Sequence, residues 1–86
     1  MKIARTDRFK KAWTELNEED RALARKALNN MIINLRYPSL RVKKIQGAEN
    51  IWEARVSRSI RLTFEIHNDT LILRNIGRHD ETLERP

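Results

Sequence analysis

The sequence contains no cysteine, two glycines and two prolines in 86 residues. Without cysteine the chain can form neither a disulfide nor a thiolate metal site. Two glycines are too few for a glycine-rich phosphate-binding loop. The two histidines, His67 and His79, stand twelve positions apart and do not match the ligand spacing of a zinc site. We therefore expect neither a metal ion nor another cofactor.

Long hydrophobic stretches are also absent. No apolar run approaches the roughly 18 residues of a membrane-spanning helix. The N-terminal residues 1–7 lack the apolar core of a secretory signal peptide. A length of 86 residues suits one small domain, residues 1–86. We expect a cytoplasmic protein of one domain with no membrane partner.

Positive charge is abundant and unevenly distributed. The formal net charge is +6. Residues 36–61 carry a net charge of +5, whereas residues 62–86 carry −2. A basic segment of this kind attracts polyanions or an acidic protein partner. A surface that is merely basic is the simpler alternative, but clustering on one segment favours nucleic acid.

The first half of the chain has the hydrophobic period of α-helices, after a short edge strand expected at residues 2–5. Thr6 is the expected N-cap of a short helix, and Asn17 that of a longer one. Pro38 with Tyr37 should end the second helix. The apolar face of the first helix consists of Phe9, Ala12, Trp13 and Leu16. The stripe of the second helix, expected in the core, consists of Leu23, Ala27, Leu28, Met31, Ile32 and Leu35.

After Pro38, apolar and polar residues alternate, which is the period of β-strands. Three strands are predicted at residues 52–56, 60–66 and 71–76, with short polar turns between them. A further strand is expected at residues 42–46. Because each helix has one apolar face, both helices should cover one face of this antiparallel sheet, which gives an α+β domain.

The uncovered face of the sheet is the candidate functional site. If the alternation holds through both central strands, Glu53, Arg55 and Arg61 lie on it together. Lys43 and Lys44 should lie nearby. The expected RNA-binding residues on and around this face are Lys43, Lys44, Arg58, Arg74 and Arg78.

These residue types match the needs of metal-free RNA cleavage. The reaction requires a base for the ribose 2′-OH, cations for the phosphate and an acid for the leaving 5′ oxygen. Arg55 and Arg61 have guanidinium groups suited to binding a phosphate through two hydrogen bonds. His79 is the candidate acid. The base stays open between Glu53 and a lysine from residues 43–44.

Each of these residues also has a purely structural interpretation. Arg61 can pair with Glu65 or Glu53 at the surface, an interaction worth about 0–1 kcal/mol. His79 can end a strand and bond to Asp80.

The order of two helices followed by a basic meander resembles the RelE/ParE superfamily of toxins from bacterial and archaeal toxin–antitoxin pairs. The resemblance spans essentially the whole chain, and its strongest part is the pattern W-x-x-R…R-L-x-F between Trp52 and Phe64. It also rests on residues 43–47 and 76–80. The resemblance implies a RelE fold. In the RelE-like branch it implies a ribosome-dependent endoribonuclease that cuts mRNA in the ribosomal A site.

The resemblance also implies roles for single residues. Arg61 matches the family's phosphate-binding arginine, and Arg55 matches a basic position where RelE members have lysine. His79 matches a position that is histidine in YoeB- and YafQ-like members and arginine in RelE itself. Glu53 departs from the pattern, because RelE has a lysine there. No aromatic residue follows Phe64, although RelE and YoeB end in a tyrosine.

The implied partners are mRNA on the ribosome and a cognate antitoxin that is acidic in its toxin-binding segment, within a toxin–antitoxin hetero-oligomer. A basic sheet face suits such a partner by charge complementarity. Two other functions stay open: ParE-like inhibition of DNA gyrase, and a catalytically inactive module that only binds antitoxin. Histidine at position 79 favours the endoribonuclease, because ParE members lack a catalytic histidine constellation.

Overall fold

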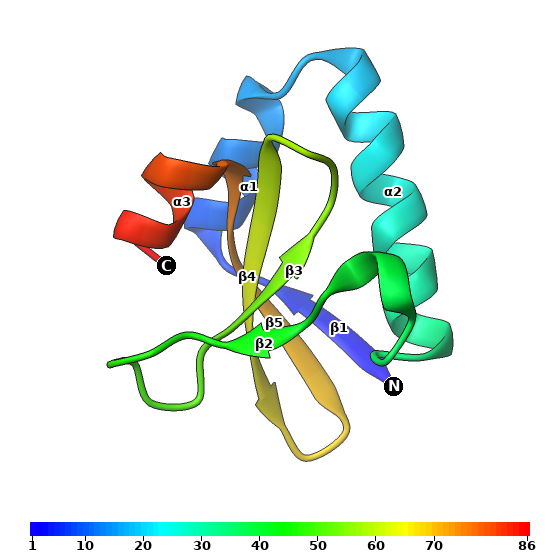
Figure 1. Cartoon of the computed structure of the whole chain (residues 1–86), viewed down its shortest axis with the longest axis vertical. Helices are drawn as coiled ribbons and strands as arrows, with labels where there is room; N and C mark the ends of the chain where they lie inside the picture. The colour runs from blue at the N-terminus through cyan, green and yellow to red at the C-terminus, as the bar shows by residue number, and fades with distance from the viewer.

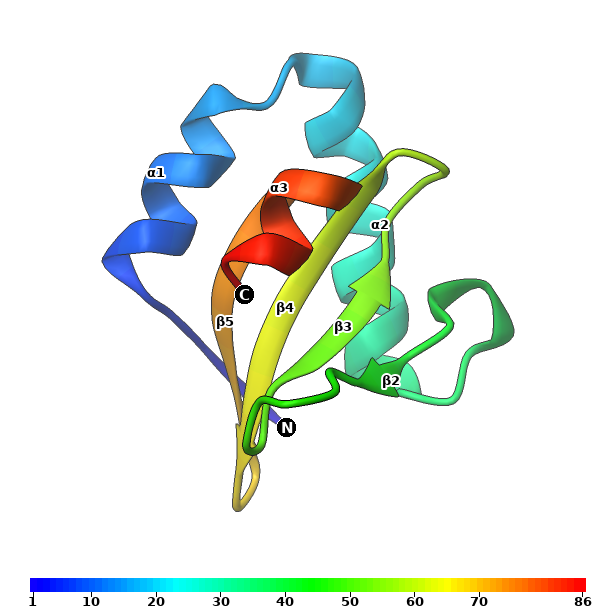
Figure 2. The same ribbon diagram turned by 60° about the vertical axis from the view of Figure 1, so that its left-hand side comes forward.

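The computed structural model describes residues 1–86 and has a five-stranded sheet with helices on both faces (Figures 1 and 2). Across the sheet, the strand order is β1-β5-β4-β3-β2. None of the helices has the length and apolar content that a membrane span requires. Along the chain, the elements are β1 (Lys2–Arg5), α1 (Asp7–Glu15), α2 (Glu18–Ile33), η1 (a 3₁₀ helix, Pro38–Leu40), β2 (Lys43–Lys44), β3 (Trp52–Arg55), β4 (Ile60–His67), β5 (Thr70–Arg78) and α3 (His79–Glu84).

Both predicted helix N-caps are confirmed. The Thr6 hydroxyl accepts a hydrogen bond from the backbone N–H of Phe9 at 3.1 Å. The Asn17 side chain accepts one from the backbone N–H of Asp20 at 2.8 Å. The predicted end of the second helix was too late, because α2 stops at Ile33. The Asn34 side chain accepts from the backbone N–H of Arg36 at 2.9 Å, and this local turn replaces a further helical turn.

The predicted meander is confirmed, because β3, β4 and β5 pair antiparallel in sequence order. The sheet as a whole is mixed rather than antiparallel, since β1 pairs parallel with the outer side of β5. The Thr6 hydroxyl anchors the end of β1 by donating to the carbonyls of Leu73 and Arg74, each at 3.1 Å. The sequence predicted strand β1 but contained no information on its partner or direction.

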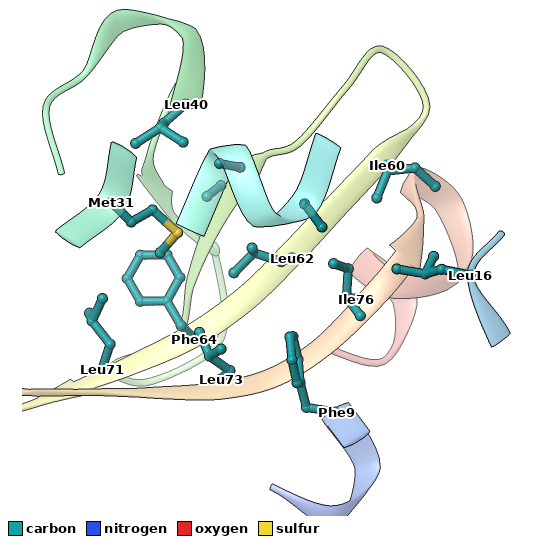
Figure 3. Packing of buried hydrophobic residues seen from close by; sticks show 13 residues of the cluster. Phe9, Leu16, Met31, Leu40, Ile60, Leu62, Phe64, Leu71, Leu73 and Ile76 are labelled. Atoms are coloured by element: carbon teal, nitrogen blue, oxygen red, sulfur yellow. The ribbon is translucent and has the colours of Figure 1, made fainter. Parts of the chain in front are cut away.

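Helices α1 and α2 cover one face of the sheet, as predicted, and their apolar side chains meet those of β4 and β5 (Figure 3). The predicted stripe of α2 was partly wrong. Leu23 and Ile32 stay 39% and 47% exposed, while Ala24, Ala27 and Met31 are buried. The buried side of α2 is therefore rotated from the predicted stripe, toward Ala24 and away from Leu23 and Ile32. The buried hydrophobic core consists of Phe9, Leu16, Ala24, Ala27, Met31, Leu40, Ala54, Ile60, Leu62, Phe64, Leu71, Leu73 and Ile76.

Helix α3 was not predicted, and it lies over β4 and β5 on the opposite face of the sheet (Figure 2). Its sequence is mostly polar and has no apolar stripe that would indicate a helix. Thr82 is buried at the point where α3 contacts the sheet. The residues after α3 are bonded to β5, because Asn75 Nδ2 donates to the Arg85 carbonyl at 3.0 Å. The polar sheet face is therefore only partly open.

Gly77 makes this docking possible, and its replacement should weaken it. A Cβ at position 77 would lie 2.9 Å from Thr82 Oγ1. Since Thr82 is buried and short, we expect Gly77→Ala to displace α3 and to lower the free energy of unfolding by about 1–3 kcal/mol. Hydrogen exchange of the α3 amides and chemical denaturation measure both effects. The double variant Gly77→Ala/Thr82→Ala should lose less free energy of unfolding than the two single variants lose together. Strictly additive losses would contradict a clash between positions 77 and 82.

Candidate functional site

The polar residues of β3 and β4 share one face, as the alternation predicted. Arg55 is the cross-strand partner of Arg61, and Glu53 is the partner of Thr63. Arg61 in turn faces Gly77 of β5. This face is opposite to the one covered by α1 and α2, because the intervening residues Ala54 and Leu62 are buried in the core. The two arginines therefore lie side by side at the end of the sheet next to the β3–β4 turn.

The β3–β4 turn holds the Arg61 guanidinium in place. Nη1 donates to the carbonyl of Ser57 at 2.7 Å, to that of Ile60 at 3.1 Å and to that of Arg58 at 3.3 Å. Arg61 forms no ion pair with Glu65 or Glu53, which were the two structural alternatives. Its Nε and Nη2 groups donate to no protein atom, so they are free to bind an anion.

The surroundings of Arg61 are strongly cationic. Partial burial lowers the pKa of Arg61, and the nearby charges of Arg55 and Arg41 lower it further, while the Glu53 carboxylate acts in the opposite direction. An arginine remains charged under these conditions. Burial is the largest cause of the lowered pKa, and repulsion from the neighbouring cations, which a bound phosphate would relieve, adds to it.

Arg41 belongs to this group although the sequence analysis did not select it. It follows η1 in a left-handed backbone conformation, with φ at 45°. Its charge acts on Arg61, a residue 20 positions later in the chain. The only sequence feature pointing to Arg41 was the basic segment at residues 36–61. Its position depends on the turn after η1, which no sequence pattern specifies.

The sequence analysis expected Glu53 on an open face, and this was wrong. Glu53 is only 7% exposed, and the neighbouring Thr63 is fully buried with a hydroxyl that has no hydrogen-bond partner. Glu53 forms neither a hydrogen bond nor an ion pair. The unpredicted α3 lies on this face of the sheet, over β4 and β5 (Figure 2). Of the two lysines on β2, Lys43 pairs with Glu53 on this face, whereas Lys44 pairs with Trp52 on the other.

His79 is anchored to the same turn as Arg61. It is the first residue of α3, and its backbone N–H donates to the Ser59 carbonyl at 2.8 Å. Its ring is about half exposed, and Nδ1 lies 3.0 Å from Asp80 Oδ1. The structural alternative, a bond to Asp80, is thus present. It occupies only one ring nitrogen, and Nε2 has no protein partner.

The remaining candidate residues lie at different distances from this turn. Arg58 is exposed within the turn itself, and Arg78 is exposed opposite Ile60 at the end of β5. Arg74 lies elsewhere, because it forms an ion pair with Glu65 and donates from Nε to the Pro86 carbonyl at 3.1 Å. No group of three or more His, Asp or Glu side chains is placed to hold a metal ion.

The Glu65 cluster gives a prediction on acid stability. Hydrogen bonds from His67, at 2.7 Å, and from Arg74 lower the pKa of Glu65. A lowered carboxyl pKa stabilises the fold above the unfolded value of about 4.3, and this contribution is lost as the pH falls through the folded value. We expect Glu65→Gln to be less stable than the parent at neutral pH, with the difference shrinking in acid. Melting temperatures of the variant and the parent over a range of pH measure this difference in stability.

Glu49 provides the matched control, since it is exposed and has no ion pair. The variant Glu49→Gln should follow the parent at every pH. If the melting temperatures of Glu65→Gln and of the parent differ by the same amount down to strongly acidic pH, the ionised Glu65 carboxylate does not stabilise the fold.

Comparison with solved structures places this arrangement among known folds. A chain of the RelB–RelE antitoxin–toxin complex from Methanococcus jannaschii matches with a TM-score of 0.76 and 20% identity, over 94% of this chain and 95% of that one. YafQ from Escherichia coli strain BL21(DE3) matches with a TM-score of 0.79 and 17% identity, over 92% and 93%. This chain has the RelE-type toxin fold.

The RelE fold predicted from the sequence is thereby confirmed, although no family model and no curated protein matches the sequence. The YoeB/ParE toxin from Agrobacterium tumefaciens also matches, with a TM-score of 0.76 and 13% identity over 92% of this chain and 99% of that one. Since one solved structure carries both the YoeB and the ParE name, the fold alone does not assign a function.

Proposed function

We propose that this chain is the toxin of a type II toxin–antitoxin system and a ribosome-dependent, metal-free endoribonuclease that cleaves mRNA. The observation that carries the proposal is the β3–β4 turn, which anchors Arg61 and His79 together beside Arg55. Two cations without counter-ions suit a phosphate, and an exposed imidazole suits proton transfer.

In the proposed reaction, the ribose 2′ oxygen attacks the adjacent phosphorus and the bond from phosphorus to the 5′ oxygen breaks. Arg61 and Arg55 stabilise the negative charge that develops on the phosphate. His79 gives a proton to the leaving 5′ oxygen. The base that accepts the 2′-OH proton stays open between Glu53 and a lysine of β2, and Lys43 is the lysine on the correct face. DNA is not cleaved because it lacks the 2′-OH.

The proposed protein partner is a cognate antitoxin with an acidic binding segment, in a hetero-oligomer in the cytoplasm. Similar structures were solved as toxin–antitoxin complexes, among them the E. coli RelBE and DinJ–YafQ complexes. The net charge of +6 favours an acidic partner. An antitoxin that binds the folded toxin and not the unfolded chain would also stabilise this small domain by mass action.

Induction of the chain in cells without an antitoxin tests this function. New 5′ ends of mRNA within translated codons are the expected result. Growth arrest with intact mRNA would indicate gyrase as the target instead. Normal growth would favour the inactive antitoxin-binding module, which the burial of Glu53 and the lack of an aromatic residue after Phe64 also favour.

A further inference from the structure

A groove of about 490 Å³ is lined by residues of α2, of η1 and of the β3–β4 turn with their neighbours in the chain. Its polar lining comes from three separate parts of the sequence, and its floor is apolar. The charged and polar residues that line it are Lys26, Asn30, Ser39, Arg41, Arg55, Ser57 and Arg58. Lys26 and Asn30 belong to α2.

The groove is cationic throughout. Lys26, Arg41, Arg55 and Arg58 line it, and no acidic residue does. None of these four side chains takes part in any of the ion pairs in the structure, which involve other residues. Four uncompensated cations around one groove repel each other, so a polyanion bound there is favoured.

The groove is continuous with the candidate catalytic site. Arg55 lines the groove and is also the cross-strand partner of Arg61. Arg41 lines the groove, and its charge lowers the pKa of Arg61. A chain of phosphates that places one phosphate at Arg61 can therefore place a neighbouring phosphate in the groove.

We propose that this groove is a phosphate-binding subsite for the RNA strand next to the cleaved bond, and that Lys26 and Arg41 are its additional ligands. The inference rests on the proposed endoribonuclease function and adds the path of the substrate. The strand runs from the sheet face at Arg61, past Arg55, to the side of α2 at Lys26. The amide of Asn30 and the hydroxyl of Ser39 are available to ribose hydroxyls.

An acidic amphipathic peptide fits the groove less well than RNA does. Such a peptide needs an apolar stripe to complement its own. Of the exposed large apolar residues, only Leu23 lines the groove, which offers a peptide one exposed apolar contact rather than a stripe. The polar lining consists of cations, hydroxyls and an amide, which are the usual contacts of a phosphate–ribose backbone.

The test measures cleavage of mRNA on programmed ribosomes as a function of toxin concentration. The variant is Lys26→Gln/Arg41→Gln. Arg5→Gln/Lys10→Gln is its control, since it removes the same charge from exposed residues outside the groove. We expect the half-saturating concentration to rise roughly tenfold for the first variant. The slope of the logarithm of the apparent affinity against the logarithm of the salt concentration should become less steep by about 0.7 per lost phosphate contact. The control should shift far less.

Binding of a short 2′-O-methyl oligoribonucleotide, which cannot be cleaved, gives an independent reading. Weaker binding by the groove variant alone supports the subsite. An unchanged half-saturating concentration, an equal shift in the control, or a loss only of binding to ribosomes without mRNA would each overturn it. So would a loss confined to an acidic peptide such as polyglutamate. If the parent cuts no mRNA at all, the proposed function has failed, and oligonucleotide binding still decides the subsite.

Discussion

Replacing His79 with alanine is expected to slow mRNA cleavage by about 10²- to 10⁴-fold, the usual contribution of a general acid or base. His79 is half exposed at the start of α3, so its truncation should leave the fold intact. Single-turnover cleavage on programmed ribosomes measures the rate.

A modified substrate separates the role of an acid from a structural role. If sulfur replaces the leaving 5′ oxygen, the leaving thiolate needs no proton, so His79→Ala should recover most of the parent rate. Asp80→Asn replaces the carboxylate 3.0 Å from Nδ1 with a neutral amide and should lower the rate much less than loss of the imidazole does. A rate for His79→Ala equal to that of the parent on the natural substrate would end the assignment of His79 as the acid.

Replacing Arg61 with alanine is expected to lower the cleavage rate by about 10²- to 10³-fold, as for other donors that stabilise developing charge. Sulfur at the leaving group should not rescue this variant, because Arg61 acts on the phosphate. Arg61→Lys keeps the charge but loses the planar fork, so an intermediate rate is expected. Arg5→Ala is the control, since Arg5 is exposed on β1 at the other edge of the sheet.

The stability of Arg61→Ala must be measured beside its activity. Nη1 donates to carbonyls of the β3–β4 turn, and each such bond contributes about 0.5–1.5 kcal/mol. A modest fall in the free energy of unfolding is thus expected, without loss of folding. If Arg61→Ala is folded and still cuts like the parent, the phosphate site lies elsewhere.

The hydrophobic pattern was sufficient to predict both N-terminal helices, their caps at Thr6 and Asn17, and the three-stranded meander. These features depend on interactions between neighbouring residues, such as the hydrogen bond from the Phe9 N–H to Thr6. The alternation of side chains also predicted correctly that Arg55 and Arg61 share a face. That inference needs only the two-residue period of a strand and the correct register.

Contacts between distant parts of the chain decided the remaining features. The parallel pairing of β1 with β5, the docking of α3 over Gly77 and the exposure of Leu23 have no local cause. For the same reason the sequence analysis placed Glu53 on an open surface and did not select Arg41.

The sequence by itself therefore determined which residue types are present, their periodicity and the basic charge of the central segment. Only the tertiary structure decided that Arg61 and His79 share one turn, that Glu53 is buried and that a cationic groove extends from Arg41 to Lys26. The physical reason is the distance along the chain over which each kind of interaction acts. Capping and alternation act over a few residues, whereas the site is assembled from segments that meet only when the core has formed.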